Sequence, residues 1–261
     1  MEEFYITNDG IKLHAKLDRP SNEPGPVAIV LHGLTGHMEE EHIVAVAQAI
    51  NELGIATLRV ELYGHGGSDG DFAEHTLYKW ITNVLAVVDY VKGLDWVEGI
   101  YLGGHSQGGL TTMLVAGMRP ADFKAIFPLS PAVVLIDAAR EGLFFGMPFD
   151  PHNVPDHLSL GPASLNGNYF RVAQTLDVES AIARYTGPVL LVHGDEDQAV
   201  PVSYSIDAAK KYANAKLVII EGDDHNYHQH LDLVTAAVKD FLTGIEGGRA
   251  AFHEPNQTDA R

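Results

Sequence analysis

Residues 100–109 of the chain, which read IYLGGHSQGG, decide the fold. An apolar run ends in GHSQG, and residues 110–117, LTTMLVAG, can continue as a helix. Gly104 and Gly108 flank Ser106 at two residues on either side, which suits a sharp turn with no room for a Cβ atom. Such a turn places the Ser106 hydroxyl at a helix N-terminus, where free N–H groups favour developing negative charge. The pattern indicates a nucleophilic serine, although it arises by chance in roughly one chain in ten of this length.

Composition narrows the classes of partner. The chain has 261 residues, 46% hydrophobic and 20% charged, and a formal net charge of −18. A surface that negative disfavours phosphate backbones and anionic membranes, so we expect neither nucleic acid nor a membrane as partner. The absence of cysteine excludes disulfides, thiolate metal sites and cysteine nucleophiles. Because no signal-peptide pattern and no apolar run of about 18 residues is visible, we expect a cytoplasmic protein.

Working outward from Ser106, apolar strands alternate with helical segments. We expect strands at residues 27–31, 55–60, 99–103, 125–129, 188–193 and 216–221, and helices at 39–53, 77–91, 107–118, 203–212 and 227–242. Residues 3–8 and 12–18 predict a hairpin around the Asp-Gly pair at 9–10. Most of the strands are apolar throughout, which is typical of strands buried on both faces. The alternation therefore predicts an α/β fold with a doubly wound, mainly parallel sheet, with functional residues at the carboxyl ends of strands.

The alternation breaks at residues 130–184. This segment is rich in proline and in aromatic residues, and a structureless loop of that length is uncommon inside a compact domain. We therefore expect a small cap inserted over the site, within a single domain that spans residues 1–245. Residues 246–261 are polar and lack any hydrophobic period, so we expect a disordered tail.

An acid and a histidine follow two later strands. A serine hydroxyl needs a histidine to take its proton and a carboxylate to hold that histidine, and in such folds they follow in the order Ser, acid, His. Residues 189–192 run into HGDED, which ends at Asp197, and residues 217–220 run into a segment that ends at His225. Three groups in the required order, each just past a strand, predict a triad of Ser106, Asp197 and His225.

Neighbouring residues offer alternatives for two of these positions. The acid loop also holds Asp195 and Glu196, and the last segment also holds His228 and His230. We prefer Asp197 because the Val-Pro pair at 200–201 resembles the acid loop of many hydrolases. We prefer His225 because His228 and His230 fall inside the expected final helix.

Two backbone N–H groups are expected to bind the oxyanion of the reaction. One comes from the residue after the nucleophile and the other from the loop after the first core parallel strand. These residues are Gln107 and Leu34, and both act through the main chain.

The remaining histidines have simpler interpretations. We expect His32 and His105 to make structural hydrogen bonds and His14 to lie on the surface of a strand. His37 and His42 could suggest a metal site, but an exposed helix start explains them better. Nothing in the sequence demands a metal or an organic cofactor.

Five motifs together carry a resemblance. They are HGLTG (32–36), GHGGSDG (64–70), GHSQGG (104–109), HGDED (193–197) and EGDDH (221–225). With them, the chain resembles the α/β-hydrolase superfamily and, more narrowly, bacterial cinnamoyl (feruloyl) esterases, over about residues 3–243. The resemblance implies an α/β-hydrolase fold with a small cap. It also implies a serine carboxylesterase that hydrolyses esters of ferulic, caffeic and p-coumaric acid, including chlorogenate.

The same resemblance implies substrate contacts in the cap. Tyr169 matches a tyrosine that contacts the aromatic ring in that family. Asp137 lies near the place of an acidic residue that binds the ring hydroxyls. Phe144 and Phe145 stand where a more polar contact is expected, which favours a less hydroxylated acyl group.

Two other functions stay open. An aromatic cap can also line an alkyl tunnel, so a monoacylglycerol lipase or a short-chain acyl esterase is the alternative. A ligand-binding homologue without activity is a remote alternative. Such proteins often lose a triad residue, whereas all three residues are present here. For each of these functions the expected partner is a small molecule, and for the cinnamoyl esterase it is an aromatic ester. A homodimer is possible.

Overall fold

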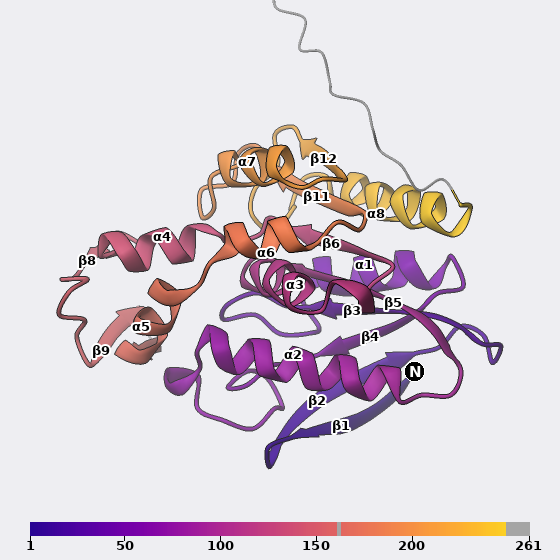
Figure 1. The fold of residues 1–261 in the computed structure, drawn as a ribbon, viewed down its shortest axis with the longest axis horizontal. Helices are drawn as coiled ribbons and strands as arrows, with labels where there is room; N and C mark the ends of the chain where they lie inside the picture. The colour runs from indigo at the N-terminus through magenta and orange to yellow at the C-terminus, as the bar shows by residue number, and fades with distance from the viewer. Residues whose placement is uncertain (161–162, 249–261) are drawn as a thin grey trace, which may run out of the picture.

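The computed structural model describes residues 1–160 and 163–248. Within these ranges eight strands form one sheet (Figure 1). In spatial order they are β1 (Glu2–Asn8), β2 (Ile11–Asp18), β4 (Ala56–Val60), β3 (Gly25–Leu31), β5 (Val97–His105), β6 (Ala125–Leu129), β11 (Val189–Gly194) and β12 (Ala215–Ile220). Seven of these strands run in the same direction, and β2 alone runs in the opposite direction, antiparallel to β1 and β4. The mainly parallel sheet that the alternating pattern predicted is confirmed.

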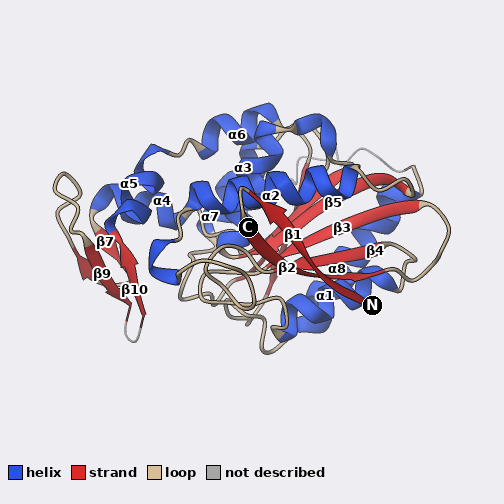
Figure 2. Cartoon of the chain, turned by 90° about the horizontal axis from the view of Figure 1, so that it is seen from below, coloured by secondary structure: helices blue, strands red, loops and turns tan. Residues whose placement is uncertain are grey.

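Helices cover both faces of this sheet (Figure 2). One face carries α1 (Glu41–Asn51) and α8 (Leu231–Glu246), and the other carries α2 (Leu77–Lys92), α3 (Gln107–Met118), α6 (Val178–Arg184) and α7 (Ser203–Lys211). Single 3-10 turns lie at η1 (Phe72–Glu74) and η2 (Pro120–Asp122). Along β3, Ile29 and Leu31 enter the core under α2 and α3, whereas Ala28 and Val30 enter the core under α1 and α8. Because successive side chains point to opposite faces, burial of both faces requires the unbroken apolar run.

The segment between β6 and β11 forms a cap beside the sheet. It holds α4 (Val134–Glu141), β7 (Leu143–Phe144), β8 (Met147–Pro148), β9 (His157–Leu160), β10 (Ala163–Asn166) and α5 (Gly167–Thr175). Figures 1 and 2 show these elements projecting to one side of the sheet and its helices. The predicted insertion ran to residue 184, but α6 packs directly on α3 and belongs to the body.

The final helix differs from its prediction. It was expected at residues 227–242 and spans Leu231–Glu246. The Asp223 carboxylate accepts hydrogen bonds from the backbone N–H groups of Gln229 and His230, at 3.1 and 3.0 Å. Tyr227 has a left-handed φ of 62°, and His230 has φ −137° and ψ 43°, so neither residue is helical and the helix starts only at Leu231. Of the predicted tail, Glu246 ends α8, and residues 249–261 lie outside the described residues.

No helix within residues 1–160 and 163–248 combines the length and the apolar character needed to cross a bilayer.

The turn between β5 and α3 is strained. Ser106 has φ 55° and ψ −119°, a conformation that L-residues rarely adopt. A Cβ atom added at Gly104 would lie 2.7 Å from the backbone of Gly108. A Cβ atom at Gly108 would overlap the carbonyl oxygen of His32, at the end of the neighbouring strand. Both glycines are therefore required by the close approach of β3, β5 and α3.

We predict that Gly108→Ala lowers the free energy of unfolding by about 1–3 kcal/mol, because the added methyl group must displace a backbone carbonyl. Gly244→Ala is the matched control, since a Cβ atom at this position of α8 meets nothing within 4 Å. Urea denaturation should show that Gly244→Ala leaves stability unchanged or raises it by up to about 1 kcal/mol. Equal stability of Gly108→Ala and the wild type would contradict the packing described for the turn.

Candidate active site

A cavity of about 520 Å³ opens beside Ser106, at the carboxyl ends of the central strands. Its wall comes from loops that follow β3, β5, β11 and β12 and from the β7–β8 hairpin of the cap. The lining residues are Gly33, Leu34, Thr35, Glu40, His105, Ser106, Phe145, Met147, Ala199, His225 and Asn226. The structure thus brings Ser106 and His225, which lie 119 residues apart in the sequence, to one cavity.

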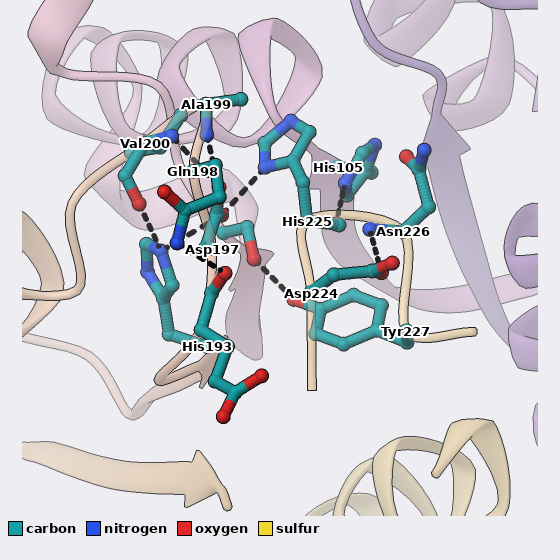
Figure 3. A network of polar contacts seen from close by, with 12 residues as sticks. His105, His193, Asp197, Gln198, Ala199, Val200, Asp224, His225, Asn226 and Tyr227 are labelled. Carbon is teal, nitrogen blue, oxygen red and sulfur yellow. Dashed lines mark hydrogen bonds and ion pairs between the residues drawn. The ribbon is translucent and has the colours of Figure 1, made fainter. Parts of the chain in front are cut away.

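Asp197 holds the ring of His225 (Figure 3). The Nδ1 atom of His225 lies 2.6 Å from Oδ2 of Asp197. Oδ1 of Asp197 accepts the backbone N–H groups of Ala199 and Val200, each at 2.8 Å. Burial raises the pKa of the Asp197 carboxyl, but hydrogen bonds from His193 and His225 lower it more, so its pKa lies well below the usual range. Since this carboxylate can only accept, His225 carries its proton on Nδ1 and leaves the lone pair of Nε2 available.

His193 is a second partner of Asp197 that the sequence analysis did not single out. Its Nε2 atom lies 3.1 Å from Oδ2 of Asp197 and 2.9 Å from the carbonyl oxygen of Val200. Because a carbonyl only accepts, Nε2–H is the donor, and Nδ1 accepts the hydroxyl proton of Ser205 at 2.7 Å. The fully buried His193 ring therefore fixes the position of the carboxylate. His193 is the first residue of the HGDED motif, so its place in that motif could have indicated its role.

His105 holds the loop of His225 from the other side. Its Nε2–H group donates to the carbonyl oxygen of His225 at 2.8 Å, and the two rings lie 4.6 Å apart. His32 likewise bonds only to structure: Nδ1–H donates to the carbonyl of Gly33, and Nε2 accepts the N–H of Leu62. Both rings make the structural hydrogen bonds expected of them, and His105 also reaches the cavity wall.

The two N–H groups predicted for the oxyanion lie beside Ser106. Leu34 is in a tight turn that the bond from Gly36 N–H to the Gly33 carbonyl closes at 3.1 Å. A Cβ atom at Gly33 would lie 3.1 Å from Cβ of Ser106, a tight contact, so glycine favours the close approach of this turn to the serine. Gln107 is the first residue of α3, where an N–H group has no intrahelical partner. Within the described parts of the chain neither N–H group donates a hydrogen bond, so both can bind an anion.

The structure divides the four predicted substrate contacts. Phe145, at the tip of the β7–β8 hairpin, lines the cavity and is 59% exposed. Phe144 and Tyr169 are fully buried and do not reach its wall, because Tyr169 Oη donates to Oε1 of Gln107 at 2.7 Å and Phe144 packs in the core. Asp137 is also off the wall, and it accepts the hydroxyl of Tyr204 at 2.9 Å.

Other wall residues escaped the sequence analysis. Glu40, Met147, Ala199 and Asn226 line the cavity. Asn226 follows His225 directly, so its position in the chain could have indicated it. The other three are placed by the course of loops and of a two-residue hairpin, for which no periodic signal exists.

The interpretation of His42 as an exposed residue is wrong. His42 is 5% exposed, and its ring lies 4.3 Å from that of His105. It belongs to the first turn of α1, and α1 packs against α8 on the same face of the sheet. His37 is exposed as expected. The described residues contain no cluster of three or more histidine or acidic side chains arranged to hold a metal ion.

A serine at a strained turn, a histidine bound to a carboxylate and two free N–H groups, all on a doubly wound sheet, define the class of serine hydrolases. Comparison with known proteins agrees. The family described as "Serine aminopeptidase, S33" matches residues 22–149, and the family described as "TAP-like protein" matches residues 166–248.

Solved structures and characterised relatives narrow the family. Est1E from Butyrivibrio proteoclasticus, solved with ferulic acid bound, is 55% identical with a TM-score of 0.92, and the match covers 94% of this chain and 99% of that one. The palmitoyl-protein thioesterase ABHD10 of Mus musculus is 28% identical over 224 residues, 80% of this chain and 71% of the relative. The monoglyceride lipase of Homo sapiens is 27% identical over 266 residues, 89% of this chain and 86% of the relative. The chain belongs to the α/β-hydrolase family and is a carboxylic ester hydrolase.

Five buried histidines around the site are uncharged near neutral pH. Burial lowers the pKa of His32 and His75 to about 3 and that of His42 to about 4. Burial also lowers the pKa of His65 and of His105. The unfolded chain binds a proton at each of these rings below about pH 6.5, whereas the folded protein binds it only at a lower pH. The stability that they contribute is therefore lost as the pH falls below that value.

We predict a steep fall in the free energy of unfolding between about pH 6.5 and 5, with about 1.4 kcal/mol per pH unit from each ring that stays neutral. Urea denaturation at several pH values measures this slope. His42→Gln should make it shallower by about that amount, because it removes one of these rings. Identical slopes for His42→Gln and the wild type would show that His42 titrates normally in the folded protein.

Proposed function

We propose that this enzyme hydrolyses esters of hydroxycinnamic acids, such as ferulate, caffeate, p-coumarate and chlorogenate, through an acyl-enzyme on Ser106. The observation that carries the proposal is the likeness to Est1E, a protein solved with ferulic acid bound. The match covers 94% of this chain at 55% identity, so it leaves too few residues unmatched to omit the cap.

The described geometry supports a mechanism in steps. Ser106 Oγ attacks the ester carbonyl carbon while Nε2 of His225 takes its proton. Asp197 keeps the other ring nitrogen protonated and stabilises the positive charge that His225 acquires. The N–H groups of Leu34 and Gln107 bind the oxyanion of the tetrahedral intermediate. His225 then gives the proton to the leaving alcohol, and a water molecule activated in the same way releases the acid.

The cap side of the cavity suits a flat aromatic acyl group. Phe145 and Met147 form its apolar wall, above Ser106. Tyr169 and Asp137 remain predicted contacts. To reach a substrate, Tyr169 would have to exchange its hydrogen bond to Gln107, and Asp137 its bond to Tyr204.

A second candidate is the hydrolysis of aliphatic acyl esters. The likeness to monoglyceride lipase over 89% of the chain supports it, and an apolar cap wall accepts an alkyl chain as well as a ring. Both candidates use the same three side chains, so only the acyl group separates them.

The test compares methyl ferulate with methyl octanoate, two esters that share the alcohol half. We expect a higher kcat/KM for methyl ferulate, and preference for methyl octanoate would favour the second candidate. Ser106→Ala should lower kcat for both esters by about 10⁴-fold or more, because the nucleophile is removed. Circular dichroism and thermal melting provide the control for folding. A folded Ser106→Ala variant that keeps its turnover would contradict the assigned nucleophile.

A further inference from the structure

A second hollow adjoins the cavity on the side of His225. It has a volume of about 210 Å³ and is lined by Glu40, Glu41, His42, Asn226, Tyr227, His228 and Leu231. Glu40 and Asn226 line both the hollow and the large cavity, so the two meet at these side chains. Figure 3 shows that Asn226 and Tyr227 continue the loop that carries His225. We call this space the alcohol-side hollow, for the reason that follows.

The position of His225 sets the direction in which the ester lies. His225 donates a proton to the leaving oxygen, so the alcohol half must depart past this ring. Phe145 and Met147, which come from the cap hairpin and not from the loop of His225, form an apolar part of the wall that suits the acyl group. The alcohol half of a bound ester therefore points toward Glu40, Asn226 and the alcohol-side hollow.

The Glu40 carboxylate is held in place at the mouth of this hollow. Its Oε2 atom accepts the backbone N–H of His37 at 3.3 Å, and its side chain is 28% exposed. A Cβ atom at Gly36 would overlap this carboxylate, which shows how closely Glu40 lies against the loop of Leu34. Burial raises the pKa of Glu40, as expected for a carboxyl group partly withdrawn from water.

His42 is a second polar side chain that lines the hollow beside Glu40. It lies on the wall, is 5% exposed, and its Nε2 atom has no hydrogen-bond partner within residues 1–160 and 163–248. Buried polar atoms of proteins are nearly always bonded, and such an exception calls for a missing partner. Nε2 lies 4.0 Å from Oε2 of Glu40, too far for a hydrogen bond between them. A ligand in the hollow therefore meets the Glu40 carboxylate first, and a hydroxyl group suits it because it can donate a hydrogen bond.

The charges around the hollow are unfavourable to an anion. Glu40 and Glu41 bring two carboxylates to its wall. Its histidine at position 228 is bonded to the Asp224 carboxylate at 2.7 Å, which offsets any positive charge on that ring. The chain as a whole carries a net charge of −18, of the same sign.

We propose that the alcohol-side hollow binds the alcohol half of the ester, and that Glu40 makes it select uncharged, hydroxyl-bearing alcohols over those that carry a carboxylate. The inference rests on the proposed ester hydrolysis at Ser106. A hydroxyl of the alcohol donates to Glu40, whereas a carboxylate at the same place meets a like charge in a partly dry site.

The experiment uses two esters with the same acyl group and alcohol halves of similar size. 2-Hydroxyethyl ferulate carries a neutral hydroxyl, and carboxymethyl ferulate carries a carboxylate at the corresponding position. For the wild type we expect a kcat/KM about tenfold higher for the hydroxyethyl ester, from repulsion between charges a few ångströms apart. In Glu40→Gln, which keeps the size of the side chain, this ratio should fall to within about threefold.

Glu2→Gln is the matched control, because it removes the same charge from an exposed position on β1 and should leave the ratio at its wild-type value. A wild-type ratio near one, or an unchanged ratio in Glu40→Gln, would overturn the proposal. If the enzyme cleaves octanoyl esters but no feruloyl ester, the proposed function fails separately. The same ratio is then measured with 2-hydroxyethyl and carboxymethyl octanoate. A wild-type ratio near one, or an unchanged ratio in Glu40→Gln, would again overturn the proposal.

Discussion

The Asp197 carboxylate holds the site together. It follows β11 and receives four hydrogen bonds: two from backbone N–H groups of its own loop, one from His193 in β11 and one from His225 beyond β12. A buried carboxylate is costly unless it is bonded in this way. The bonds therefore serve two purposes, since they offset the burial of the charge and they fix the ring of His225, which lines the same cavity as Ser106.

The opposite side of the site depends on close packing of backbone. Gly33, Gly104 and Gly108 let β3, β5 and α3 approach one another without Cβ atoms between them. This approach sets the N–H groups of Leu34 and Gln107 beside the serine. The strain at Ser106 is tolerated because the turn is held on both sides, by the bond from its N–H to the Leu129 carbonyl and by the first bond of α3. The buried ring of His105, next to the serine, is hydrogen-bonded to the carbonyl oxygen of His225 and so connects the serine turn with the histidine loop.

The sequence predicted the elements that have a regular pattern of apolar residues, and the functional residues that directly follow such elements. Strands buried on both faces have unbroken apolar runs, so β3, β5 and β11 were predicted within a few residues of their bounds. Ser106, Asp197 and His225 follow β5, β11 and β12. The start of α8 was misplaced because Tyr227 takes a left-handed backbone conformation, which the period of the apolar residues does not reveal.

The cap could not be predicted in the same way. An aromatic residue there can contact a substrate or fill the core, and the composition of the segment does not separate these uses. Phe145 reached the cavity, whereas Phe144, its neighbour in the chain, went to the core. Glu40 and His42 belong to the same category, because the fold of the loop before α1 brings them to the site and no motif marks them.

The assignment of the acid is tested most directly by comparing Asp197→Asn with Asp195→Asn. Asp195 follows the same strand, but it is exposed and accepts only the backbone N–H of Gly222 among the described residues. Steady-state hydrolysis of methyl ferulate by the folded variants should show a kcat about 10³–10⁴-fold lower for Asp197→Asn, because an amide no longer holds the productive tautomer of His225. Asp195→Asn should stay within about threefold of the wild type. Near-wild-type turnover by Asp197→Asn, or an equal loss in Asp195→Asn, would contradict the account.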